Sequence, residues 1–325
     1  MGKRTDYIKK KKHKRLRFFF IFITILFIGV GGYAYHLYNE IKRTVDVDIY
    51  KTVDSIELNP KKAEEGKETL HILLMGVDER INDIGRTDTL ILLSLNPNTD
   101  RMQLMSIPRD TRTEIVGKGI QDKINHAYPL GIAAGGTEKN GINMTIATVE
   151  NFLDIELDYY IKMNMEGLPQ LVDAVGGITV KNPISWVDSG YYKKGYHYKK
   201  GTITLDGEQS IGYVRMRKQD PEGDVGRNKR QRLVIQGIID KGASLSSINH
   251  IDEILHTLGN NMSTNLSFRE MKDLFTNYRN TRKHVDSYQI SGRNENINGS
   301  WYVIVPEEER QKAHEKLITF HDHQS

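Results

Sequence analysis

The apolar run LHILLMG occupies positions 70–76 and ends in a glycine. A short run of this kind is typical of a strand that is buried on both faces of a sheet. Two similar runs follow closely, TLILLSL at 89–95 and MQLMSI at 102–107, and a proline comes within two residues of the end of each. Three such strands in succession predict a central sheet that begins near residue 70.

Helical and extended patterns alternate after these runs. Positions 138–153 show helical spacing, positions 158–163 alternate like a strand, and positions 167–175 suit a short helix. Further elements are expected as helices at 228–241, 248–258, 268–278 and 307–320, and as strands at 285–290 and 301–305. Strands that alternate with helices predict an α/β fold, here a three-layer α/β/α domain with a mixed central sheet over residues 69–325.

Residues 18–38 read FFFIFITILFIGVGGYAYHLY and contain no Asp, Glu, Lys or Arg. As a helix this segment would be roughly 31 Å long, which matches the hydrocarbon core of a bilayer. Nine Lys and Arg residues and one acid precede it, so the positive-inside rule keeps residues 1–17 in the cytoplasm. The alternative, a cleaved signal peptide, needs a shorter apolar core and a small-residue cleavage site. We therefore expect a single-pass anchor at 18–38 in the cell membrane, an extracellular stalk at 39–68 and an extracellular C-terminal domain.

The composition excludes several kinds of function. The 325 residues include no cysteine, which excludes disulfides, thiolate metal sites and a cysteine nucleophile. The net charge of +4 averages a strongly basic tail and a body, residues 18–325, with 37 basic and 41 acidic residues. A mildly acidic body argues against nucleic acid as a partner. The basic tail is better explained as a topology signal than as the DNA-binding arm of a transcriptional regulator.

Acidic and basic residues gather where the first strands end. Asp78 follows the first strand and Asp88 precedes the core of the second, with Arg86 nearby. If these strands are neighbours, the two carboxylates meet at one edge of the sheet. Such a pair suits Mg²⁺, which prefers oxygen ligands and often shares them with substrate phosphates. On spacing alone, the same two residues would equally well cap loops.

The segment Ser106-Ile-Pro-Arg109-Asp110 lies after the third strand, at the end of the sheet where α/β proteins usually bind ligands. Taken alone, it is more simply a turn with solvated charges. Arg215 and Arg217 stand two residues apart, so on a strand both side chains would point to one face.

Arg227, Arg230 and Gln231 have the spacing of one helix face at the positive end of a helix dipole. Arginine recognises phosphate in a planar, bidentate way, and the sequence lacks the P-loop motif, so these residues indicate a phosphate site of another kind. A solvated basic face is the alternative.

Eight segments together resemble the LytR–CpsA–Psr family of bacterial envelope proteins. In chain order these segments are LLMGVDER (73–80), GRTDT (85–89), SIPRDT (106–111), KINHAY (123–128), TVENFLDIELDYYIKMN (148–164), LVDAVGGI (171–178), LDGEQSIGYVRMR (205–217) and GDVGRNKRQ (223–231). Their order and spacing, rather than any single one, carry the resemblance.

The resemblance implies a transferase of cell wall biogenesis. It would move an anionic glycopolymer, wall teichoic acid being the first expectation, from a polyprenyl pyrophosphate carrier to peptidoglycan through a phosphodiester bond. The resemblance implies that Asp78 and Asp88 bind Mg²⁺. The implied phosphate ligands are Arg86, Arg109, Arg215, Arg217, Arg227 and Gln231. Asp110 and Asp224 are the candidate bases, with Arg109 beside them.

Several points stay open at the level of the sequence. The apolar helices are expected to enclose the prenyl chain, and the loop at 185–201 is the candidate for contact with the sugars. A non-catalytic polyprenyl-pyrophosphate-binding module would use the same arginines. A pyrophosphatase that hydrolyses the carrier is a further alternative, with free polymer phosphate as its product.

Overall fold

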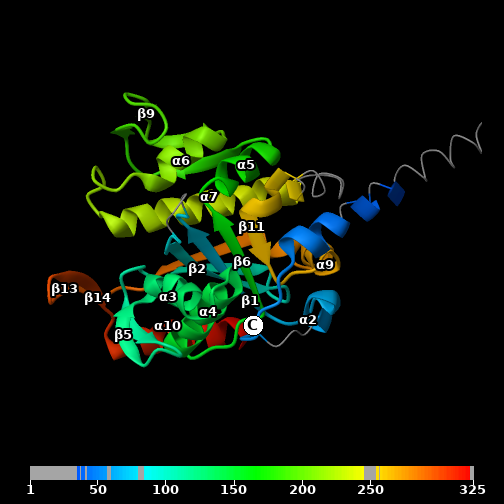
Figure 1. Ribbon diagram of the computed structural model, residues 1–325. Helices are drawn as coiled ribbons and strands as arrows, with labels where there is room; N and C mark the ends of the chain where they lie inside the picture. The colour runs from blue at the N-terminus through cyan, green and yellow to red at the C-terminus, as the bar shows by residue number, and fades with distance from the viewer. Residues whose placement is uncertain are drawn as a thin grey trace, which may run out of the picture.

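The computed structural model describes residues 35–36, 38–40, 42–56, 60–79, 84–244, 254–255 and 257–322. Its centre is a six-stranded sheet in the order β11-β6-β1-β2-β3-β12 (Figure 1). The strands are β1 (Leu70–Val77), β2 (Thr87–Asn96), β3 (Arg101–Ser106), β6 (Tyr159–Asn164), β11 (Met262–Thr264) and β12 (His284–Gln289). β1, β2 and β3 pair antiparallel, whereas β6 pairs with β1 and β12 with β3 in parallel. The expected α/β fold with a mixed central sheet is confirmed.

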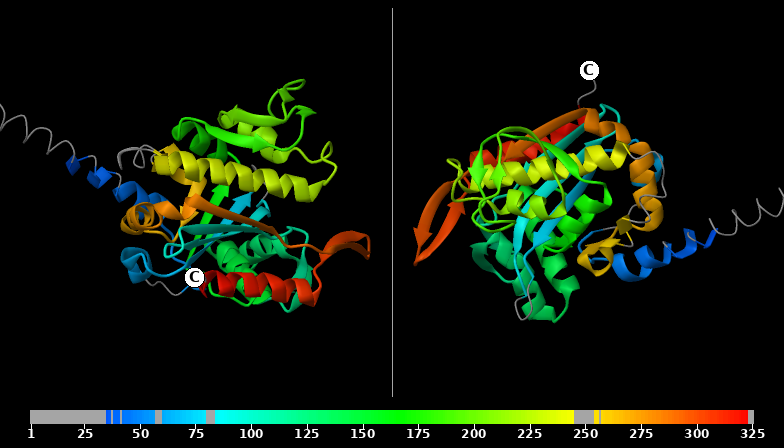
Figure 2. Two further views of the ribbon diagram at one scale, coloured as in Figure 1. Left: turned by 180° about the vertical axis from the view of Figure 1, so that it is seen from behind. Right: turned by 90° about the horizontal axis from the view of Figure 1, so that it is seen from above.

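Helices cover both faces of this sheet, which explains why its first strands are apolar throughout. In β1, Leu73 packs into the core on one face and Ile72 into the core on the other. The first core lies against α3 (Ala127–Gly135), α4 (Glu138–Leu153) and α10 (Glu307–Asp322). The second lies against α2 (Pro60–Glu65), α7 (Asp224–Ser244) and α9 (Phe268–Asn277). Figure 2 shows α7 and α10 on opposite sides of the sheet.

A further layer rests on α7 and has a core of its own. This outer layer, residues 167–216, comprises α5 (Gly167–Ala174), β7 (Ile178–Asn182), β8 (Trp186–Val187), β9 (His197–Tyr198), β10 (Gly201–Leu205) and α6 (Gly207–Arg215). Its buried aromatic rings include Trp186, Tyr198 and Tyr213. Two small hairpins, β4 (Arg112–Ile115) with β5 (Ile120–Lys123) and β13 (Arg293–Ile297) with β14 (Ser300–Ile304), complete the strands of the described residues.

The prediction that Arg215 and Arg217 share a strand is wrong. Asp206 caps α6, its side chain and that of Gln209 forming a reciprocal capping box, and the helix then runs to Arg215. Arg217 follows in a loop. Val214 and Met216 are both buried, and this alternation over a few residues gave the appearance of a strand. So short a pattern does not separate a strand from the end of a helix.

Part of the expected stalk packs against the domain. A turn of π-helix at Val45–Ile49 buries Val45 and Ile49 completely, in a cluster that includes Phe268. The expected transmembrane segment 18–38 lies outside the described residues except at 35–36 and 38. Among the helices that the structure describes, none combines the length and the apolar character needed to cross a bilayer.

Glu150 of α4 makes stability depend on pH. Burial raises the pKa of its carboxyl to about 7, although the Leu157 N–H donates to Oε1 at 3.0 Å and lowers it. A folded-state pKa above the unfolded value of about 4.3 favours folding at low pH, and this contribution is lost as the pH rises through 7. We expect Glu150→Gln, which keeps the acceptor oxygen, to melt a few degrees higher than wild type at pH 8. Near pH 4 the difference should vanish; melting curves of both proteins from pH 4 to 8 measure it.

Candidate functional site

A cavity of about 840 Å³ lies between the sheet, α7 and the outer layer. One face of α7 forms a wall of this cavity along much of the helix. The residues that α7 contributes are Arg227, Gln231, Val234, Ile235, Ile238 and Ile239. Their spacing places them on one face, and at 1.5 Å per residue they extend over roughly 18 Å. Because the first two are polar and the last four apolar, the cavity has a charged mouth and an apolar interior.

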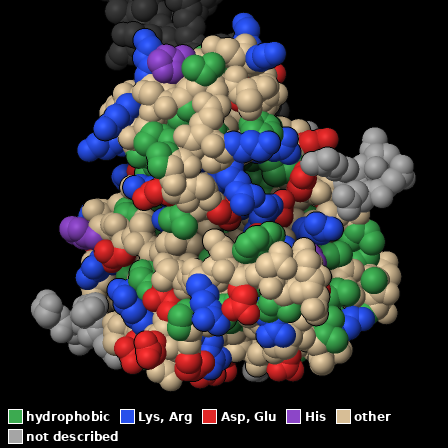
Figure 3. Space-filling model, turned by 90° about the vertical axis from the view of Figure 1, so that its left-hand side faces the viewer, with side chains coloured by type: hydrophobic (Ala, Val, Ile, Leu, Met, Phe, Trp, Pro, Cys, Tyr) green, Lys and Arg blue, Asp and Glu red, His purple; other side chains and the backbone are tan. Residues whose placement is uncertain are grey.

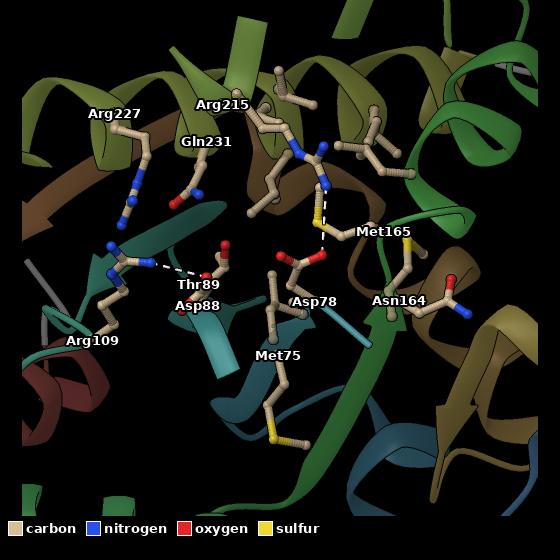
Figure 4. Close-up of a pocket in the computed structure, with 18 of the residues that line it drawn as sticks. Met75, Asp78, Asp88, Thr89, Arg109, Asn164, Met165, Arg215, Arg227 and Gln231 are labelled. Carbon is tan, nitrogen blue, oxygen red and sulfur yellow. Dashed lines mark ion pairs between the residues drawn. The ribbon is translucent and has the colours of Figure 1, made fainter. Parts of the chain in front are cut away.

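The sheet shows the same change from polar to apolar. Asp78 and Asp88 lie at the ends of β1 and β2, whereas Leu74, Leu93 and Ile161 line the cavity deeper in the sheet. Figure 4 shows both carboxylates directed into the cavity below α7. The pairing of β1 with β2 therefore brings the two predicted metal ligands to one place.

The two ends of the connection between β1 and β2 lie close together, and this fixes the backbone at Asp78. The N–H of Asp78 donates to the carbonyl of Arg86 at 3.2 Å, and Gly85 adopts a φ of +77°. A Cβ at Gly85 would lie 2.7 Å from the carbonyl oxygen of Asp78. A side chain at position 85 would therefore force apart the two ends of the connection between β1 and β2. Glycine is the residue that tolerates both conditions.

Arginines reach the two carboxylates from the loop after β3 and from the end of α6. Arg109 Nη1 lies 2.9 Å from Asp88 Oδ2, and Arg215 Nη2 lies 3.5 Å from Asp78 Oδ1 (Figure 4). The basic residues that line the cavity are Arg109, Arg215, Arg217, Lys218 and Arg227, and the acidic ones are Asp78, Asp88 and Asp220. Since Asp220 is paired with the buried Arg230, the mouth carries a surplus of positive charge. Figure 3 shows basic and acidic side chains gathered at the centre of one face of the molecule.

The surroundings shift the pKa values of Arg227 and Arg109 in opposite directions. Burial lowers the pKa of the Arg227 guanidinium, and the positive charges of Arg109 and Arg217 lower it further, against the opposing effect of Asp224. Burial also opposes the charged form of Arg109, yet three carboxylates, Asp88 foremost, raise its pKa. Repulsion between buried arginines is relieved when an anion binds between them.

The Nε atoms of Arg109 and Arg227 are buried and have no hydrogen-bond partner among the described residues. Buried polar atoms in folded proteins are normally satisfied, so unused donors at the mouth indicate room for an acceptor. The side chain of Arg227 is only 9% exposed. An anion bound here would therefore be held in surroundings with little water, where hydrogen bonds to charged groups are strong.

Other candidate residues lie at the margin of the mouth. Asp224 is 3.0 Å from Arg227 Nη2 and 3.3 Å from Arg217 Nε, so it holds two arginines of the cavity. Asp110 accepts a hydrogen bond from Lys123 Nζ at 2.8 Å. Neither carboxylate is among the residues that line the cavity. Their position indicates support of the arginines, and the role of each as a base stays a prediction.

Arg86 and Arg230 differ from the remaining arginines. Arg86 is exposed and does not line the cavity, so its role in phosphate binding stays a prediction. Arg230 follows Arg227 by three residues on α7, as predicted, but it does not line the cavity, so the interpretation of Arg230 as part of the phosphate site is wrong. Its side chain is fully buried under the outer layer, where Nε donates to the carbonyl of Tyr213 at 3.1 Å.

The lining residues that were not predicted as ligands include Asn164 and Tyr191. Asn164 ends β6, the parallel neighbour of β1, so the rule that places ligands at strand ends would have found it. Tyr191 comes from the loop after β8, within the stretch 185–201 that was the candidate for contact with the sugars, but no pattern in the sequence singled out this residue.

Asp78 and Asp88 fit one kind of metal site. The described part of the chain holds no group of three or more His, Asp or Glu residues arranged to bind a metal ion. Two carboxylates alone suit Mg²⁺ if substrate oxygens and water complete its ligands, because Mg²⁺ is commonly held by one or two carboxylates and by phosphates. The donor set is compatible with Mg²⁺ that arrives with a phosphorylated substrate.

The fold and the cavity define a class of protein: an α/β domain with a cavity that is charged at its mouth and apolar in its interior. The chain belongs to the LytR_cpsA_psr family, whose model matches residues 33–319, and this confirms the resemblance seen in the sequence. It is 44% identical, over 92% of its length and 93% of the relative's, to the polyisoprenyl-teichoic acid–peptidoglycan teichoic acid transferase TagU of Bacillus subtilis (strain 168).

Solved structures agree with this membership. The crystal structure of B. subtilis TagU matches with a TM-score of 0.63 and 40% identity, over 80% of this chain and 99% of that one. A structure of TagT bound to LIIa-WTA matches with a TM-score of 0.66 and 32% identity, over 82% and 94% of the two chains.

Proposed function

We propose that this protein transfers an anionic glycopolymer, wall teichoic acid, from a polyprenyl pyrophosphate carrier to peptidoglycan and forms a phosphodiester bond. One observation carries the proposal: a single face of α7 runs from Arg227 and Gln231 to four apolar residues within one cavity. A polyprenyl pyrophosphate has the same division, a compact anion at the end of a hydrocarbon chain. The names of the relatives support the choice of polymer and acceptor.

The residues of the mouth have distinct roles in this proposal. Arg109, Arg215, Arg217 and Arg227, with Gln231, bind the pyrophosphate and stabilise the charge that develops on the leaving prenyl phosphate as its bond to the polymer phosphate breaks. A hydroxyl of peptidoglycan attacks that phosphorus and passes its proton to one of the two candidate bases, Asp110 or Asp224. Asp78 and Asp88 would hold Mg²⁺, which would neutralise further phosphate charge when bound. The apolar part of the cavity encloses the first prenyl units.

The proposed place of action is the outer face of the cell membrane, with a single N-terminal anchor and the domain outside. This arrangement would bring the mouth to a carrier that resides in the bilayer. The anchor rests on the sequence of residues 18–38. Fusion of a reporter to either end, tested for protease access in intact cells, would check the orientation.

The full chain, lipid-linked donor and peptidoglycan test the reaction. Mass spectrometry of peptidoglycan fragments should show polymer joined through a phosphodiester, and omission of Mg²⁺ with chelator present should reduce the product. Free polymer phosphate without attachment would favour a carrier pyrophosphatase. Donor binding without any product would favour a non-catalytic binding module.

The two candidate bases are separated by the dependence of the rate on pH. Asp224 holds Arg217 and Arg227, so we expect Asp224→Asn to lower the transfer rate by about 100-fold through misplaced arginines and to leave the shape of the pH profile unchanged. If the rate of this variant no longer fell at low pH, where a base becomes protonated, Asp224 would instead be identified as the base. Asp110→Asn, measured alongside, identifies Asp110 if it removes that fall in rate.

A further inference from the structure

Five exposed lysines lie on the outer layer, close to the cavity and not used by the proposed reaction. This group, which we call the lysine edge, consists of Lys181, Lys193, Lys194, Lys199 and Lys200. None of the five has an ion pair among the described residues, while other lysines, such as Lys51 and Lys162, are paired with carboxylates. Uncompensated charge of one sign attracts a partner of the other sign.

Acidic residues are few in the stretch that carries the lysine edge, and the next two, Asp206 and Glu208, stand at the start of α6. Between residues 178 and 205 the sequence contains a single acid, Asp188. Asp188 is 3% exposed, and its carboxylate accepts hydrogen bonds from the backbone N–H groups of Tyr191, Tyr192 and Lys193 at 3.2, 2.8 and 2.7 Å. Asp188 therefore shapes the loop and does not form an ion pair with any of the five lysines.

Aromatic packing holds the backbone of this loop. Trp186 and Tyr198 stack with ring centroids 4.6 Å apart, and Tyr196 meets Tyr198 edge-on at 4.9 Å. Tyr192 packs edge-on against Tyr196 at 5.1 Å. The backbone that carries the lysines is therefore held by packed aromatic side chains.

The lysine edge is continuous with the mouth of the cavity. Tyr191, two residues before Lys193, lines the cavity. Gln219 Nε2 donates to the carbonyl of Val187 at 2.7 Å, which joins this loop to the segment that carries Arg217 and Lys218. Figure 3 shows basic side chains both at the centre of the face and along its upper end, where the outer layer lies. A chain that leaves the mouth can follow positive charge outward.

The two groups of basic residues differ in chemistry. Partly or largely buried arginines suit one fixed pyrophosphate, because the planar guanidinium binds oxygen in a bidentate way. Exposed lysines are flexible point charges and suit phosphates that recur along a chain at positions that vary. We propose that the lysine edge binds the phosphodiester backbone of the polymer being transferred, while the arginines bind its pyrophosphate. This inference rests on the proposed function.

Two lipid-linked donors distinguish an effect of the lysine edge on polymer binding from an effect on the transfer step. One carries a polymer of many phosphodiester units on the lipid pyrophosphate, and the other carries a single sugar unit on the same lipid. The test variant replaces four lysines by glutamine at positions 193, 194, 199 and 200. At low ionic strength we expect it to lower kcat/KM for the long donor by about tenfold, to leave the short donor unchanged, and to lose the difference in high salt.

The matched control replaces four lysines on the far side of the protein. They are Lys67, Lys118, Lys312 and Lys316. This variant has the same net charge as the test variant, so an equal loss with the long donor would overturn the lysine edge as a specific site. Equal losses of the test variant with both donors would also overturn it. If wild type transfers neither donor, the proposed function itself fails.

A binding measurement gives a readout without turnover. The probe is a lipid-free glycerol phosphate polymer, titrated into the full chain in neutral lipid nanodiscs, with monomeric glycerol phosphate as the comparison. We expect wild type and the control variant to bind the polymer with an affinity that falls as salt rises, and the test variant to bind it about tenfold more weakly. Equal polymer binding by all three proteins would contradict the proposal.

Discussion

Replacement of Arg227 by alanine is expected to abolish polymer attachment while the domain stays folded. Arg227 lies at the start of α7 with its guanidinium in the mouth, between Arg109 and Gln231 (Figure 4). Loss of one well-placed donor to a developing anion typically lowers the rate by about 10²–10³-fold, and here two or more bonds to phosphate are lost. The measurement is kcat/KM for transfer from the lipid-linked donor to peptidoglycan.

The domain should stay folded with a modest loss of stability: Arg227→Ala removes the ion pair with Asp224 and some buried contacts, but it also removes a charge that neighbouring arginines repel and burial disfavours. Arg227→Lys keeps the charge without the planar fork and should retain a small part of the activity. Arg112→Ala, at an exposed position on β4, is the matched control and should transfer like wild type. Wild-type transfer by Arg227→Ala, or by Asp88→Ala on the facing strand, would overturn the assignment of the site.

The sequence was sufficient to predict the centre of the sheet. Strands buried on both faces need apolar residues at nearly every position, so β1 and β2 are visible as continuous runs. Consecutive strands joined by a short loop usually pair, so the polar residues at their adjoining ends are expected to lie close together. That is why the meeting of Asp78 and Asp88 could be anticipated without coordinates.

The local structure around the arginines was less predictable. Val214 and Met216 face one core from the end of a helix and the loop after it, and a strand would show the same alternation. Periodicity places Arg230 near Arg227 on α7, but it does not say which residues the outer layer will cover. That layer is built from strands as short as two residues, which leave almost no pattern in the sequence.

Arg230→Met is expected to produce the largest loss of stability, about 3–5 kcal/mol in the free energy of unfolding. Arg230 is fully buried; it donates to the carbonyls of Tyr213 and Met216, pairs with Asp220, and lies 5.2 Å from the Trp186 ring. Methionine fills a similar volume but leaves two carbonyls and one buried carboxylate without their partner. Denaturant unfolding of the purified protein, read by Trp fluorescence, measures the change.

The double variant Arg230→Met, Asp220→Asn decides whether the buried charge is the cause. Removing the orphaned carboxylate should recover part of the loss, because an uncompensated buried ion costs more than an absent pair. The Asp220 carboxyl also lies close to the position that a Cβ at Gly226 would occupy, so the pair holds the start of α7 against the loop that carries Arg217. Activity should therefore fall in both variants even where stability recovers. An unchanged unfolding curve for Arg230→Met would contradict a stabilising role of this guanidinium, and the packing of the outer layer on α7 would then need another explanation.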